Sequence, residues 1–121
     1  MPPLVEALDR ACPGYVPDEG EADLPYIWMS RFVRHVIRAR LEGAEDQIRA
    51  VFAVIEKAIA GNGADRELAI IGFLEDLQNS NLHAEGSLPE QFEAYLGPQS
   101  RKKWIELGGF WHAVIATKQQ P

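Results

Sequence analysis

The feature that most constrains the fold is an almost uninterrupted apolar run in the middle of the chain, from Leu68 to Leu77. Only Glu75 and Asp76 interrupt it. A helix that is apolar nearly all round is normally surrounded by other helices. The run therefore predicts a central helix from about Asp65, a suitable N-cap residue, to about residue 79. We expect Gly72 to allow a close backbone approach at its middle.

The rest of the chain also carries helical periodicity, and proline and glycine separate its segments. No apolar–polar alternation lasts more than about four positions, which argues against strands. The sequence of 121 residues therefore predicts one compact all-α domain of five or six helices, and helix pairs joined by short turns could stack. A Gly108–Gly109 pair in the last segment predicts a kink or a tight crossing. The other expected helices cover about residues 2–11, 25–42, 44–60, 89–96 and the segment from about 100 onwards.

The helix expected at 25–42 has two faces of different chemistry, and Gly43 is placed to end it. The apolar stripe, which we expect in the core, consists of Met29, Phe32, Val33, Val36 and Ile37. The basic stripe opposite consists of Arg31, Arg34, His35 and Arg38. Since the whole chain has a net charge of −6, this concentration of positive charge requires an explanation.

An acidic segment directly precedes the basic stripe. Residues 13–25 are rich in proline, glycine and acid, which indicates a loop. Residues 1–25 carry a net charge of −5 and residues 26–42 carry +3. Three readings stay open: the acids cover the arginines or both faces are solvated, the charges dock a protein partner, or the arginines bind an anion. The candidate partner-binding residues are Asp18, Glu19, Glu21, Asp23, Arg31, Arg34, His35 and Arg38.

A second candidate site involves charged residues at positions that should be partly buried. By helical angle Glu75 falls near Leu68 and Ile71, and Arg40 falls on the apolar side of its helix. A buried charge must be paired or neutralised. We therefore expect Glu75 to pair with Arg40 or Arg101, either as a structural ion pair or as part of a pocket with a perturbed acid.

Other chemistries lack the residues that they require. No histidine lies in a metal-ligand pattern, no nucleotide-binding loop is complete, and the sequence suggests no cofactor. Cys12, the only cysteine, stands at a helix C-terminus, where the helix dipole disfavours a thiolate, so we expect a small buried residue. The acidic balance disfavours nucleic acid and anionic membranes. With no signal peptide or membrane-spanning run, we expect a cytoplasmic protein.

Two segments together resemble a known kind of domain. They are Gly72–Asn79 (GFLEDLQN) and Tyr95–Trp104 (YLGPQSRKKW), followed by Phe110-Trp111. They resemble a group of small bacterial helical domains of unassigned function, some of which are similar to immunity proteins that neutralise a sister cell's toxin. The resemblance covers roughly residues 65–112. It implies an all-helical bacterial cytosolic protein and transfers no catalytic residue.

These observations favour a non-enzymatic cytosolic protein-binding domain, with a basic partner such as a toxin, because inhibitors of proteins with basic clefts are acidic. The alternative is a small enzyme or ligand-binding protein with a pocket around Glu75. Oligomerisation through the helical segment Trp104–Ile115 is a third possibility.

Overall fold

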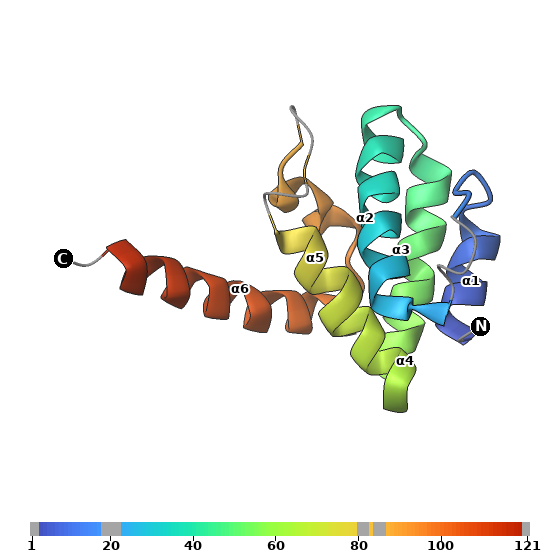
Figure 1. Cartoon of the computed structure of the whole chain (residues 1–121). Coiled ribbons are helices and arrows are strands. Elements are labelled where there is room, and N and C mark those ends of the chain that lie inside the picture. Colours follow the sequence, from blue (N-terminus) through green and yellow to red (C-terminus); the bar gives the residue numbers. More distant parts are fainter. Residues whose placement is uncertain (1–2, 18–22, 80–82, 84–86, 120–121) are drawn as a thin grey trace.

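The fold is built around two long antiparallel helices, α2 (Pro25–Leu41) and α3 (Glu45–Ala60), as Figure 1 shows. The structure is a computed structural model that describes residues 3–17, 23–79, 83 and 87–119, with side chains up to residue 108. Helix α1 (Pro3–Ala11) packs on α3. No strand occurs among the described residues, so the all-α prediction is confirmed.

A tight turn joins α2 to α3 and explains why Gly43 occupies its position. Its φ of +83° lies in the left-handed region that favours glycine. The Ala44 N–H donates to the Ala39 carbonyl and the Gly43 N–H donates to the Arg40 carbonyl, each at 3.0 Å. These two bonds form a Schellman motif, which satisfies carbonyls left over at the end of α2. The predicted helix end is confirmed.

The central apolar run forms one rod made of three consecutive pieces, α4 (Gly63–Glu67), η2 (Leu68–Leu74) and α5 (Glu75–Gln78). The rod begins at Gly63, whose φ is +76°, so the prediction of Asp65 as its N-cap is wrong. The middle piece is π-helical, and the Glu75 N–H bonds to the carbonyl of Ile70, five residues earlier. The hydrophobic periodicity of the sequence did not predict a π-helix, which is a rare form of helix.

The rod lies against α2, α3 and α6, as expected of a central helix. Phe73 is fully buried and meets Phe52 of α3 edge-on, with the ring centroids 5.4 Å apart. Ile71, however, is 43% exposed, so the rod is not covered on every side. The five residues of the predicted apolar stripe of α2 are all buried, which confirms that prediction.

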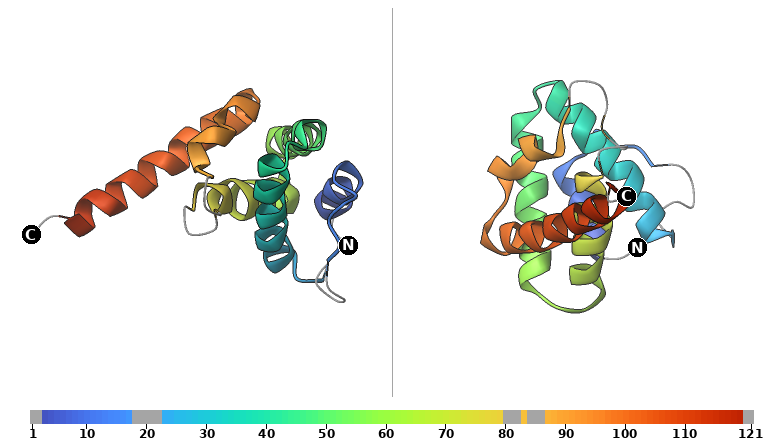
Figure 2. Two further views of the ribbon diagram at one scale, coloured as in Figure 1. Left: turned by 90° about the horizontal axis from the view of Figure 1, so that it is seen from above. Right: turned by 90° about the vertical axis from the view of Figure 1, so that its left-hand side faces the viewer.

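The chain then continues through η4 (Pro89–Tyr95), a 3-10 helix, into α6 (Pro98–Gln119). The first turns of α6 pack on α3 and on the rod, and its C-terminal part extends beyond the rest of the fold (Figures 1 and 2). The backbone of α6 is one continuous helix through Gly108–Gly109. A Cβ on Gly108 would meet the Gln78 side chain at an ordinary 3.6 Å. The predicted tight helix crossing is therefore not found at Gly108.

Candidate functional site

Two hollows flank the outward face of α2. The α2–α5 groove, of about 530 Å³, lies between α2 and the rod. The basic hollow, of about 380 Å³, lies between α2 and the segment Gly14–Val16 that follows α1. Arg31 and Arg34 line both. Because the buried stripe of α2 fixes the helix in the core, its outward arginines stand on a rigid support.

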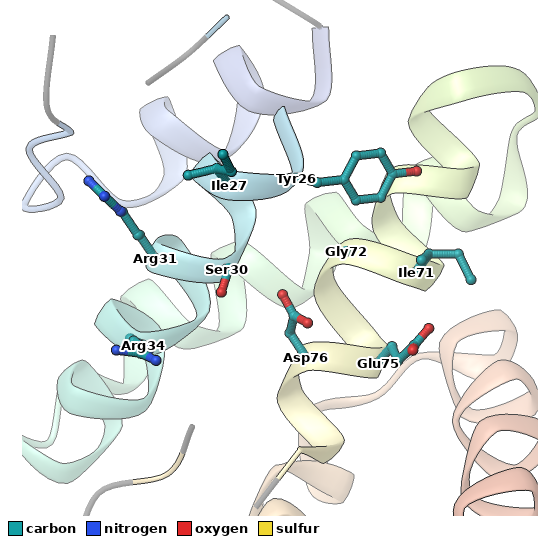
Figure 3. A pocket seen from close by; sticks show the side chains of 9 residues that line it. All are labelled: Tyr26, Ile27, Ser30, Arg31, Arg34, Ile71, Gly72, Glu75 and Asp76. Atoms are coloured by element: carbon teal, nitrogen blue, oxygen red, sulfur yellow. The ribbon is translucent and has the colours of Figure 1, made fainter. Parts of the chain in front are cut away.

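The α2–α5 groove combines large exposed apolar side chains with charged ones. Tyr26 and Ile27 come from the first turn of α2, and Ile71 comes from the π-helical piece; they are 45%, 49% and 43% exposed. Figure 3 shows Asp76 pointing into the space beside Ser30, whereas Glu75 projects from the other side of the rod. The groove therefore offers apolar contacts with carboxylates at their edge.

Asp76 has an unusual protonation equilibrium. Its pKa is raised from 3.8 to about 6, first because burial disfavours the charged form and second because Glu75 is a neighbouring negative charge. The Arg34 guanidinium opposes the rise. No hydrogen bond contributes to the shift. The groove thus holds a partly buried carboxyl group that the described chain stabilises only weakly in its charged form.

The predicted set of Glu75, Arg40 and Arg101 is not assembled around the groove. Glu75 is half-buried there as expected, but the two arginines do not line it. Arg40 instead donates to the Gln91 amide oxygen at 3.1 Å, and its guanidinium lies 5.4 Å from the centre of the Phe92 ring. Arg101 donates to the carbonyl of Glu93. The helical angle identified a partly buried face of Arg40 but not the element, η4, that packs against it.

The four residues of the basic stripe lie together along α2, and all of them line the basic hollow. His35 is half-buried, with its ring 5.4 Å from that of Tyr15. Burial and the nearby Arg38 lower its pKa, while Glu42 opposes this. Asp23 is exposed just before α2. The predicted acids Asp18, Glu19 and Glu21 lie outside the described residues.

One carboxylate with a structural role that the sequence did not single out is Glu56 of α3. It accepts hydrogen bonds from the backbone N–H groups of Gln99 at 3.0 Å and Ser100 at 2.8 Å, and from the Ser100 hydroxyl at 2.9 Å. It thereby caps the N-terminus of α6. These bonds lower its pKa although burial opposes them. The segment Gly97–Ser100 could have indicated this role, because it begins a helix without a side chain of its own to cap it.

Several remaining predictions also meet the structure. Cys12 is fully buried, as expected, and burial raises the pKa of its thiol. Trp104 lies in the core and donates to the Glu93 carboxylate. The side chains of residues 109–115 lie outside the described part of the chain, so oligomerisation through Trp104–Ile115 stays a prediction. Within the described residues, no three potential metal ligands are grouped, and no helix is long and apolar enough to cross a membrane.

Comparison with known proteins gives a family but no activity. A family model described as a domain of unknown function (DUF7674) matches residues 5–112. Neither a curated protein nor a solved structure matches the chain. The match spans both hollows and the α3–α6 junction.

Proposed function

The chain belongs to the DUF7674 family, and we propose that it is a non-enzymatic protein-binding domain that docks a basic protein partner in the α2–α5 groove. The observation that carries this proposal is the exposure of Tyr26, Ile27 and Ile71 around one hollow. Exposed apolar side chains scattered singly are ordinary, but a cluster with a polar edge is typical of an interaction site.

The carboxylates on the rod side of the groove support a basic partner, although Arg31 and Arg34 balance their charge on the α2 side. Glu75 and Asp76 are consecutive on the rod and project from different sides of it. The raised pKa of Asp76 marks an acid whose charged form receives no stabilising hydrogen bond from the described residues. A lysine or arginine of a partner would supply the missing positive charge and favour ionisation. The net charge of −6 would also speed association with a basic protein.

The resemblance to toxin-immunity domains suggests that the partner is a toxin. One of its two segments, Gly72–Asn79, supplies the groove residues Gly72, Glu75 and Asp76. We therefore propose a bacterial cytoplasmic protein that neutralises a basic toxin by occupying its surface. The arginine-lined side of the same groove would orient the partner by repelling its basic groups away from α2.

Co-purification with a toxin-like product of a neighbouring gene tests this function. Ile27→Ser and Ile71→Ser should each weaken binding by about tenfold or more, because apolar contacts at an interface centre dominate affinity. Ile105→Ser on α6, where the side chain is 65% exposed, is the matched control and should bind normally. Failure of the wild type to bind any such product, or equal binding by all variants, would contradict the proposal.

A second candidate is a small-molecule site or enzyme that uses Asp76. Its support is the Asp76 pKa of about 6, which suits a general acid or base near neutral pH. Asp76→Asn would then abolish turnover of a small substrate, whereas in the docking function it would alter partner affinity and there would be no turnover to lose. Comparing both readouts in this one variant separates the two functions.

A further inference from the structure

The basic hollow brings cationic groups together on one side of α2. Arg31, Arg34 and Arg38 recur at one- and two-turn spacing, so they lie along a single helix face. Among the described residues, no carboxylate lies within ion-pair distance of Arg34 or Arg38. Gly14 forms part of the opposite wall. Arg34 and Arg38 thus line one hollow without forming an ion pair among the described residues, although Arg34 also acts electrostatically on Asp76 in the α2–α5 groove.

His35 adds a polar atom to the same hollow. Its Nε2 is buried and has no hydrogen-bond partner among the described residues. The ring packs against Tyr15 and Phe32, at centroid distances of 5.4 and 6.5 Å. A Cβ on Gly14 would lie 4.0 Å from this ring edge, so the glycine leaves room there. A buried nitrogen without a partner costs free energy, and an acceptor entering the hollow would remove that cost.

We propose that the basic hollow binds a phosphate group, with Arg34 and Arg38 as its charged donors and His35 as a neutral donor. A guanidinium matches phosphate oxygens with two parallel hydrogen bonds, and several such donors suit a phosphate with three or four oxygens better than a carboxylate with two. The hollow, at about 380 Å³, falls in the range of small-ligand sites.

The same chemistry could come from free inorganic phosphate or from a phosphate monoester such as a nucleotide. A long nucleic acid is disfavoured, because the net charge of −6 opposes binding along its backbone. The two sources differ in what fills the rest of the hollow, where the Tyr15 ring would contact a base or sugar. Titration with each source therefore distinguishes them.

The test is titration of the ¹⁵N-labelled full chain with inorganic phosphate and, separately, with AMP, at constant ionic strength, with adenosine as the uncharged control. We expect saturable NMR shifts at Gly14 and at the His35 ring nitrogens. Tighter binding of AMP than of phosphate supports a monoester, and equal binding supports the free ion. Absence of saturable shifts with both up to about 10 mM would overturn the proposal.

Variants on the same helix keep the test specific. Arg38→Gln removes a guanidinium that lines only the basic hollow, and Arg34→Gln/Arg38→Gln removes both. The double variant should bind at least about tenfold more weakly. Arg49→Gln, an exposed arginine on α3, is the charge-matched control and should bind like the wild type. Because thermal melts report folding separately, equal binding by the double variant and the wild type would also overturn the proposal.

Discussion

Two junctions between helices each contain a partly buried carboxylate, and the two carboxylates are treated in opposite ways. At the α3–α6 junction, Glu56 accepts three hydrogen bonds and its pKa is lowered. In the α2–α5 groove, burial of Asp76 is not compensated by hydrogen bonds and its pKa is raised to about 6. Burial acts in the same direction on both, so the donors decide the sign. The first junction is complete within the chain, whereas the second is open to an external donor.

Glycine has a different role in the same two regions. A Cβ on Gly97 would lie 2.6 Å from the Glu56 carboxyl group, so the capping carboxylate occupies the space that a side chain would need. A Cβ on Gly72 in the groove would lie 3.0 Å from the Leu68 side chain and 3.2 Å from the Met29 side chain. The first region excludes a side chain, and the second is only tight. The α3–α6 junction is therefore the region that tolerates substitution of its glycine less well than the α2–α5 groove does.

The largest predicted effect is at Gly97. Gly97→Ala should lower the free energy of unfolding by about 2–3 kcal/mol, because the new methyl group displaces Glu56 and breaks the cap of α6. Gly108→Ala is the control, since its Cβ would make only an ordinary contact with Gln78 at 3.6 Å. Urea denaturation measures both. A loss at Gly97 no larger than at Gly108 would show that the capping arrangement is not rigid.

Exchanging each carboxylate for its amide should sharpen the comparison next. At pH 7, Glu56→Gln should destabilise the fold by about 1–2 kcal/mol, because a charged acceptor of three hydrogen bonds is lost. Asp76→Asn should stabilise it by about 1–2 kcal/mol, because a charged, partly buried and partly solvated carboxylate with a raised pKa is replaced by a neutral amide. Denaturation of the two variants measures these opposite signs, and equal signs would contradict the account.

The pH dependence of stability should separate the carboxylates further. The folded pKa of Asp76, about 6, lies above its unfolded value of 3.8, so its favourable contribution is full below pH 3.8 and is lost as pH rises through 6. The stability advantage of Asp76→Asn over the wild type should therefore develop as the pH rises from about 4 to about 7 and then persist at higher pH. Glu56 acts oppositely, because its contribution is present above its unfolded pKa of 4.5 and is lost as the pH falls through the lower folded value. Urea titrations at several pH values check both windows.

The smallest predicted effect concerns the interaction of Arg34 with the groove. Arg34→Gln should raise the pKa of Asp76 by a few tenths of a unit, because the positive charge of Arg34, which opposes the rise, is removed. The titration of the Asp76 carboxyl carbon by NMR measures this change. Arg49→Gln on α3 should leave it unaltered. If the pKa of Asp76 does not rise in Arg34→Gln, Arg34 does not influence the charge state of Asp76.

The sequence was sufficient for those features that depend on periodicity and turn chemistry. The buried stripe of α2 and the helix end at Gly43 followed from spacing and from the preference of glycine for positive φ. Neither depends on which helix packs against which. The central position of the rod could also be predicted, because its apolar surface requires neighbours on most sides.

The candidate sites were harder to predict, because they depend on contacts between distant segments. Spacing indicated a charged residue near the core at Arg40, but only the packing of η4 explains its contacts with Gln91 and Phe92. Likewise, the sequence predicted a perturbed acid at Glu75, which lies in the correct turn of the rod, but Asp76 is the acid whose pKa is raised by burial. A one-residue difference turns a side chain by about 100° around a helix, which periodicity alone resolves poorly.

The contrast between the two junctions is tested most directly by one NMR titration that follows the side-chain carboxyl carbons of Asp76 and Glu56 in the same sample. We expect Asp76 to titrate with a pKa of about 6 and Glu56 with a pKa below 4.5. This result would show that the groove acid lacks internal donors while the capping acid has them. A pKa for Asp76 close to 3.8 would contradict the account, because the groove would then already satisfy its own carboxylate.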